Sequence, residues 1–127
     1  MNESTKRTTV ESLAKGIKMF DQQLLRSVLT DDVVWSLPGN SLISGEAHGV
    51  EAVISRAETL HNYNVKIGLE HVVFGFRDVA IILHNTGQHA GKQLDEHLIT
   101  VCTLKGKQIQ RMDTFLSDVA MADGYFV

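Results

Sequence analysis

The sequence predicts an α+β fold in which about three N-terminal helices pack against a cone-shaped, curved antiparallel sheet. Apolar residues recur at helical spacing in the first half of the chain. From Tyr63 onward the period falls to two, and β-branched and apolar residues dominate. Between residues 94 and 116, two long apolar stretches flank a polar turn at residues 105–108, which is typical of a β-hairpin.

The size and composition of the chain indicate one domain, residues 1–127. With 127 residues, of which 43% are apolar and 21% charged, the chain can bury a core without metals or disulfides. The formal charge of −3 comes without a run of Lys or Arg, so nucleic acid is not an expected partner. Cys102 is the single cysteine, which fits a reducing compartment.

The N-terminal segment is too charged for a secretory signal. Charged side chains recur through residues 1–20 and interrupt the apolar core that a signal needs. The longest strongly apolar run, residues 79–83, is far shorter than the roughly 20 residues of a membrane helix. We therefore expect a soluble, cytoplasmic protein without a membrane partner.

Capping residues and apolar spacing predict the helices of the first half. Thr8 followed by Glu11 has the form of a capping box and predicts the start of an amphipathic helix that runs through residue 20. Asp21 is placed to cap a second, shorter helix. After a strand at residues 33–37 and a loop, apolar residues at helical spacing predict a third helix at residues 50–60.

The second half is expected to be sheet. Alternation at residues 65–69 predicts one strand, and the chain is expected to turn at residues 90–92 between the next strand and the long hairpin. Asp118 is placed to cap a short terminal helix. The first arm of the hairpin is apolar on both faces, and its outer face carries Ile99 and Val101. Since such a strand needs a cover on each side, we expect a homodimer through the outer face.

The order of these elements and several motifs resemble the nuclear transport factor 2-like superfamily, a cystatin-like α+β barrel fold. Within it, the chain resembles the SnoaL-like group of polyketide cyclase and ketosteroid isomerase relatives. The resemblance spans nearly the whole chain and rests on motifs in the family's order, namely residues 29–35 ahead of Pro38 and Gly39, Gly45 and Gly49 ahead of the third helix, residues 91–95, and Asp118 with Asp123 and Phe126.

The resemblance implies a conical pocket lined by the concave face of the sheet. The residues that it places in this pocket are Trp35, Leu37, Leu98, Thr100, Cys102, Leu104, Met112, Thr114 and Leu116. The set is mostly apolar and suits a small lipophilic ligand better than a phosphate or a sugar. Trp35 can stack on a flat ligand and donate its N–H, although packing in the core is an equal alternative.

The expected catalytic residues of the relatives are missing from this pocket. SnoaL-like cyclases use a buried histidine and aspartate beside a carbonyl group, and ketosteroid isomerases use an aspartate base. Here the cyclase positions fall on Thr100 and Thr114, and the isomerase base falls on Leu37. Because a threonine needs a neighbouring group to activate it, the relatives' activities do not transfer directly.

Glu96 and His84 are the candidate acid/base residues. Glu96 shares the inward parity of Leu98, where a buried carboxylate could act as general acid or base; a place at an open rim, in water, is the alternative. His84 and Asn85 precede the hairpin turn, and whichever faces inward could donate a hydrogen bond to a ligand oxygen. The uncertain register of the turn leaves that choice open.

Other ionisable residues are expected outside the pocket. Asp113 is expected to face outward and pair with Arg111, and His97 to face the dimer contact. No metal site is expected, because His84, His89 and His97 are scattered and no histidine–carboxylate motif of familiar spacing occurs. No cofactor is expected either.

Two functions fit the sequence. The first is a cofactor-independent isomerase, cyclase or hydratase that moves a proton on a small lipophilic carbonyl compound, with Glu96 or His84 as acid/base and Thr100 and Thr114 orienting the substrate. The second is a non-catalytic ligand-binding or dimeric interaction module. A cavity that contains an ionisable group favours the first, and the fold alone cannot decide.

Overall fold

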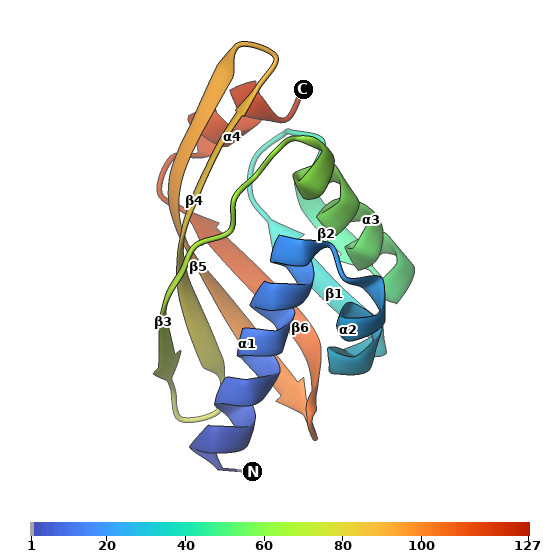
Figure 1. The fold of residues 1–127 in the computed structure, drawn as a ribbon. Coiled ribbons are helices and arrows are strands. Elements are labelled where there is room, and N and C mark those ends of the chain that lie inside the picture. The colour runs from blue at the N-terminus through green and yellow to red at the C-terminus, as the bar shows by residue number, and fades with distance from the viewer. Residues whose placement is uncertain (1) are drawn as a thin grey trace.

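A computed structural model describes residues 2–127 and confirms the predicted α+β class (Figure 1). The elements in chain order are α1 (Glu3–Met19), α2 (Gln22–Val28), β1 (Leu29–Leu37), β2 (Gly45–His48), α3 (Val50–Asn62), β3 (Leu69–Phe74), β4 (Val79–His89), β5 (Lys92–Lys105), β6 (Gln108–Leu116) and α4 (Val119–Tyr125). Of the helices within residues 2–127, none is long and apolar enough to cross a membrane.

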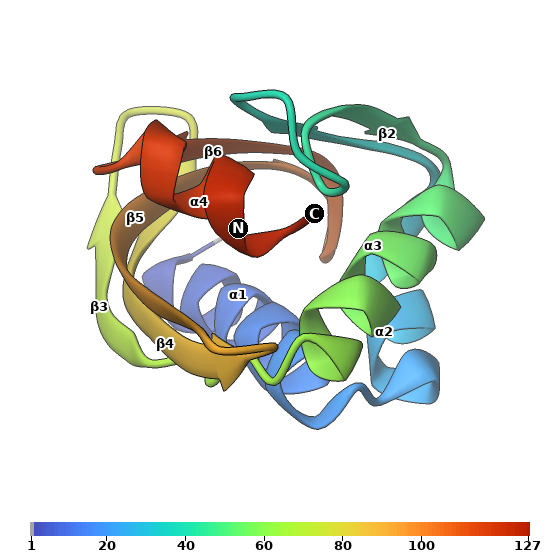
Figure 2. The ribbon, with the colours of Figure 1, turned by 90° about the horizontal axis from the view of Figure 1, so that it is seen from above.

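The strands form one curved, six-stranded sheet in the order β2-β1-β6-β5-β4-β3. Neighbouring strands are antiparallel except β1 and β6, which pair in parallel. The parallel pair departs from the expected antiparallel sheet. Parallel strands need a long connection, and most of the chain lies between β1 and β6. Helix α1 packs in the concavity of the sheet, and α4 lies across one end of the resulting cone (Figure 2).

The first helix begins earlier than predicted. Its N-cap is Asn2, whose side-chain oxygen accepts a hydrogen bond from the Thr5 N–H at 2.9 Å. The Thr8 hydroxyl donates to the Ser4 carbonyl at 3.0 Å, in the interior of the helix. The capping box was therefore wrong, because a cap must precede the first free N–H groups and Thr8 lies one turn inside.

The caps predicted for the two short helices are confirmed. The Asp21 carboxylate accepts from the Leu24 N–H at 3.1 Å, and the Asp118 carboxylate accepts from the Met121 N–H at 3.0 Å. Each aspartate satisfies a backbone donor that has no partner within its helix.

Three strands differ from the prediction. Strand β1 begins at Leu29, four residues before the predicted start at residue 33. Strand β2 was not predicted, because only four residues, with glycine first, pair with the edge of β1. Residues 65–68 were expected to form a strand but make a single bridge, Lys66 to Thr86, before β3 begins at Leu69. The chain passes so close to β4 at Gly68 that a Cβ there would lie 2.5 Å from the His84 carbonyl oxygen.

A buried arginine fixes the edge of the sheet that carries Trp35. Arg56 of α3 is 9% exposed, and its guanidinium donates to the backbone carbonyls of Trp35 at 2.7 Å and Gly45 at 3.1 Å. The guanidinium carbon also lies 5.2 Å from the centre of the Trp35 ring, a cation–π contact. Loss of hydration lowers the pKa of Arg56 from its usual value.

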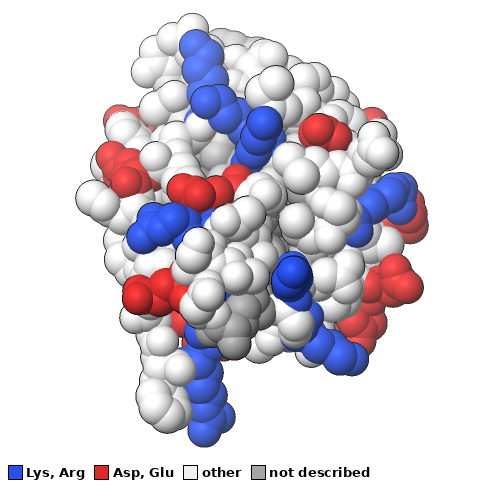
Figure 3. All heavy atoms as spheres, turned by 60° about the horizontal axis from the view of Figure 1, so that its bottom comes forward, with Lys and Arg blue, Asp and Glu red and all other residues white. Residues whose placement is uncertain are grey.

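The charged side chains are mixed over the surface. On the face shown in Figure 3, Lys and Arg are interspersed with Asp and Glu, so that face carries no extended patch of one sign. Some of the opposite charges on the surface form ion pairs, for example Arg26 of α2 with Glu51 of α3.

Candidate functional site

Two small cavities lie inside the cone. The first has a volume of about 40 Å³ and is closed in part by Ile43, Ala122 and Phe126. The second, about 30 Å³, lies between α1 and the sheet. The residues that line both are Trp35, Leu60, Asn85 and Leu98. Ligand pockets usually measure roughly 300–1,000 Å³, so a ligand of ordinary size fits only if covering residues move.

Glu96 is the ionisable residue in the wall of the first cavity. Its side chain is on β5 and only 2% of the residue is exposed, so the alternative position in water is wrong. One carboxylate oxygen, Oε2, accepts from the Ser117 hydroxyl at 2.8 Å and the Asp118 N–H at 2.6 Å. The other oxygen, Oε1, is buried and has no hydrogen-bond partner within residues 2–127. Such an atom is unusual in a folded protein.

The sheet register answers which residue of the His84–Asn85 pair faces inward. Asn85 is 8% exposed and lines both cavities, and it lies directly opposite Glu96 across the β4–β5 ladder. Its Oδ1 accepts from the Gly68 N–H at 3.4 Å, and its amide nitrogen is the group that can donate a hydrogen bond. His84 lies on the outer face, where it contacts Asp95 and stacks on His97.

A buried hydroxyl pair occupies the centre of the concave face. The Trp35 indole N–H donates to the Thr114 hydroxyl at 2.9 Å, and the Thr114 and Thr100 hydroxyl oxygens lie 2.8 Å apart. The indole donor is therefore satisfied within the protein, and a ligand would meet the face of the ring. Thr100 and Thr114 have no base beside them among their hydrogen-bond partners, so neither is activated as a nucleophile.

Of the remaining residues assigned to the pocket, some line a cavity and others, Cys102 and Leu104, line neither. Leu37, Leu98 and Leu116 line the first cavity, and Leu98 and Met112 line the second. Cys102 is fully buried but lines neither, and burial raises the pKa of its thiol to about 12. Its thiol therefore stays protonated at neutral pH and is no nucleophile. Leu104 packs against the core from a half-buried position outside both cavities.

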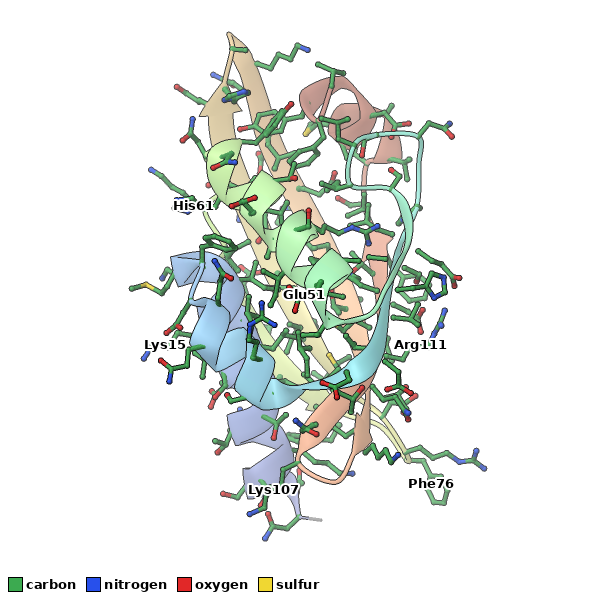
Figure 4. All side chains as sticks on the ribbon, turned by 90° about the vertical axis from the view of Figure 1, so that its right-hand side faces the viewer. Lys15, Glu51, His61, Phe76, Lys107 and Arg111 are labelled. Atoms are coloured by element: carbon green, nitrogen blue, oxygen red, sulfur yellow. The ribbon has the colours of Figure 1, made fainter. Side chains whose placement is uncertain are left out.

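The outer face of the sheet has an apolar centre with charged residues beside it. Ile99 is 42% exposed and Phe115 is 60% exposed, and they are partners across β5 and β6. Asp113 accepts hydrogen bonds from the Ser36 hydroxyl at 2.6 Å and from Arg111 at 3.0 Å. Arg111 projects from the outer side of the sheet, as Figure 4 shows. The outward direction predicted for Asp113 and its pairing with Arg111 are thus confirmed.

Several residues that line or support the first cavity were not assigned to the pocket from the sequence. Ser117 and Asp118 hold Glu96 from positions 21 and 22 residues away along the chain. Ile43 and Phe126 come from a loop and from the end of the chain, and a backbone hydrogen bond of 3.0 Å joins Leu42 to Phe126. No periodic pattern marks such residues, because neither segment is a strand of the sheet.

Known proteins support the fold. The structure is similar to Bal32a from a soil-derived mobile gene cassette, with a TM-score of 0.92, 23% identity and 98% of each chain covered. It is also similar to a nuclear transport factor 2-like protein from Burkholderia xenovorans LB400, with a TM-score of 0.82, 17% identity and 96% of each chain covered. A protein from Jannaschia sp. CCS1 that is assigned as a SnoaL-like polyketide cyclase is similar at a TM-score of 0.71 and 17% identity, over 92% of this chain and 90% of that one.

These similarities confirm the nuclear transport factor 2-like fold expected from the sequence, in the form shared with SnoaL-like proteins. A scan against protein-family models gave no match, and neither did a search of curated proteins. At these identities the likeness establishes the fold alone, because one fold hosts many kinds of chemistry.

Proposed function

We propose that this chain is a cofactor-independent acid/base enzyme of the isomerase, cyclase or hydratase type, acting on a small lipophilic compound with a carbonyl group. The observation that carries the proposal is Glu96, whose Oε1 has no hydrogen-bond partner and which lies in the wall of a mostly apolar cavity. A carboxylate that acts as a general base needs a fixed orientation and one oxygen that is free to take the proton. In Glu96, hydrogen bonds to Oε2 fix the orientation, and Oε1 has no partner.

The proposed reaction begins with proton removal. Oε1 of Glu96 takes a proton from the carbon beside the carbonyl, and the electron pair of the broken C–H bond moves toward the carbonyl oxygen. The amide nitrogen of Asn85 donates a hydrogen bond to that oxygen as its negative charge grows. Glu96 then returns the proton to another carbon in an isomerisation. In a cyclisation, the enolate carbon adds to a second carbonyl carbon of the same substrate, and the oxygen of that carbonyl takes up the electron pair of its C=O bond and the proton from Glu96. Asn85 and Glu96 are suited to the two roles because they are direct neighbours on β4 and β5.

The walls of the cavity support a lipophilic substrate. Leu37, Leu98 and Leu116 line the same cavity as Glu96, and the Trp35 ring adds a flat surface on which a planar ligand can stack. Thr114 lies in the same wall, held by the Trp35 N–H. We assign Thr114 to orienting the substrate, with Thr100 of the second cavity holding the Thr114 hydroxyl at 2.8 Å, since neither threonine can act as a base unaided.

The cover of the first cavity must open for a substrate. Two hydrogen bonds join its loop to the C-terminal segment, from the Leu42 N–H to the Phe126 carbonyl at 3.0 Å and from the Asn40 N–H to the Asp123 carboxylate at 2.9 Å. Both bonds can be exchanged for bonds to water, at a net cost of about 1 kcal/mol for the first and about 1.5–3 kcal/mol for the second, whose acceptor is a carboxylate. Separation of these two segments is the entry route that we propose.

A non-catalytic binding module is the second candidate. The observations that favour it are the enclosed volume of about 40 Å³ and the presence of Thr100, Thr114 and Leu37 where relatives carry acids and bases. In that case Glu96 serves only to hold the start of α4 through Ser117 and Asp118.

The experiment begins with Trp35, the single tryptophan, whose fluorescence reports on ligands in either cavity. The full chain is titrated with a panel of steroids, polyketides and terpenoids, and each compound that binds is tested for conversion. In Glu96→Gln the amide oxygen still accepts from Ser117 and Asp118, but the base is gone. We expect unchanged binding and a rate lower by roughly 10²- to 10⁴-fold.

Glu70→Gln is the matched control, because Glu70 is exposed on β3 and the chemical change is the same. Wild-type turnover in Glu96→Gln would refute the enzyme proposal. Binding without conversion in the wild type would favour the binding module, and the absence of any binding would exclude both ligand-based functions.

We further propose that two copies associate through the outer face of the sheet. The apolar pair Ile99 and Phe115 at its centre supports this arrangement, since soluble proteins seldom leave large apolar side chains together in water. The ion-paired residues Arg111 and Asp113 would form part of the rim.

A further inference from the structure

The outer face of the β4–β5 hairpin brings two histidines and an aspartate together. His84 and His97 are direct partners across the ladder, and their rings stack with centres 4.2 Å apart and an angle of 15° between the planes. Asp95 lies two residues before His97 on the same face, and its carboxylate contacts the His84 Nε2. One nitrogen of each histidine and one oxygen of Asp95 all lie within 4.8 Å of one another.

This arrangement is close to the geometry of a three-ligand metal site. At metal–ligand distances of roughly 2.0–2.2 Å, the ligand atoms around a tetrahedral zinc ion lie roughly 3.3–3.6 Å apart. Rotation of the exposed side chains is needed to bring the three atoms to that spacing, whereas their backbone is already fixed by the sheet. His84 and Asp95 have 36% and 69% of their side chains exposed, so an ion can approach from solvent.

We propose that His84, Asp95 and His97 bind a divalent transition-metal ion of the zinc type. Two imidazoles and one carboxylate suit zinc, whereas calcium and magnesium prefer sites made only of oxygen. The fourth position is left open to water or to a ligand from outside the chain. The sequence spacing of His84 and His97 did not predict this site. The two residues become neighbours only through the register of the β4–β5 hairpin.

The metal site is separate from the proposed acid/base site. Asn85 and Glu96 are the next pair along the same two strands and point to the other face. A bound ion would therefore lie on the outer side of the strands, and its binding does not depend on the proposed catalysis. The test is correspondingly a direct measurement of binding.

The experiment titrates zinc into the metal-free, tag-free full chain, with calorimetry and competition against a chromophoric chelator as readouts. We expect one zinc ion per chain and a rise in melting temperature on binding. His84→Ala, His97→Ala and Asp95→Asn each remove one metal ligand. In metal sites generally, loss of a residue that only hydrogen-bonds to a ligand weakens metal affinity roughly tenfold to hundredfold. We therefore expect each of the three variants to lose at least that much zinc affinity. Cobalt(II) in place of zinc should give the visible absorption of a site with nitrogen and oxygen ligands.

His48→Ala is the matched control, because His48 and Glu46 form an exposed histidine–carboxylate pair at 3.2 Å on β2 without the third ligand. This variant should bind zinc like the wild type. The proposal is overturned if the wild type binds no zinc below millimolar concentration, or if the three variants and the control lose affinity equally. Circular dichroism of each variant separates a lost ligand from a lost fold.

Discussion

At the scale of single residues, this protein buries polar groups in two contrasting ways. The Arg56 guanidinium is buried among carbonyl oxygens that accept its hydrogen bonds, and a buried group satisfied in this way stabilises the fold. The Glu96 carboxylate leaves one oxygen without a partner, which costs stability and is the pattern of a residue kept for chemistry. The two residues are therefore expected to respond differently to substitution.

Arg56→Met should destabilise the protein. Methionine fills much of the same volume but leaves the carbonyls of Trp35 and Gly45 without a donor, and we expect the free energy of unfolding to fall by about 3 kcal/mol. Urea denaturation measures the change. Arg26→Met is the control, because Arg26 makes an exposed ion pair with Glu51 and such pairs contribute little. Equal losses in the two variants would contradict the role assigned to Arg56.

At the scale of elements, the segment between α3 and β3 is positioned by a close backbone contact. A Cβ at Gly68 would lie 2.5 Å from the His84 carbonyl oxygen, and a backbone atom of β4 cannot move aside as a side chain can. The same segment places the Gly68 N–H against Asn85. The absence of a side chain at Gly68 is thus part of what orients the proposed oxygen-binding residue.

Gly68→Ala should lower the free energy of unfolding by about 2 kcal/mol or more, because the clash forces the segment away from β4. Gly124→Ala provides the contrast: it is the same change in α4, where a Cβ would meet nothing within 4 Å. Alanine there should stabilise by about 0.5 kcal/mol through helix propensity. Thermal and urea unfolding of both variants checks the prediction, and it would be wrong if the two changes had the same sign.

At the scale of the whole molecule, the sheet presents two faces with different surroundings. Helices cover the concave face, and the two cavities lie between them and the sheet, whereas Ile99 and Phe115 are exposed on the outer face. The proposed dimer would bury this apolar centre, and the proposed metal site lies on the same face at the β4–β5 hairpin.

Phe115→Lys should convert the dimer to a monomer. A charged side chain at the centre of the interface would lose hydration without gaining a partner, so we expect dimer affinity to fall by at least about tenfold, or 1.4 kcal/mol. Analytical ultracentrifugation measures the effect. Phe76→Lys is the control, because Phe76 is 97% exposed at the β3–β4 turn and projects away from the body of the molecule (Figure 4). A monomeric wild type would refute the proposed interface.

The sequence by itself determined the class of fold and the inward side of the central strands. Periods of 3.6 and 2 separate helices from strands, and strict alternation is why Trp35, Thr100 and Thr114 are all buried as the family resemblance implied. Asp21 and Asp118 were identified as caps because a cap and the backbone N–H that it binds are only three residues apart. Such local signals are readable from a single chain.

Only the tertiary structure decided which polar groups meet. The register of the β4–β5 hairpin places Asn85 on the concave face and pairs His84 with His97 on the outer face. A shift of one residue would have exchanged the two faces of the strand. Burial of Glu96 depends on Ser117 and Asp118 after β6, and on the cover formed with Phe126. These contacts join segments that are distant in the sequence, so they depend on how the whole chain packs and leave no periodic trace in it.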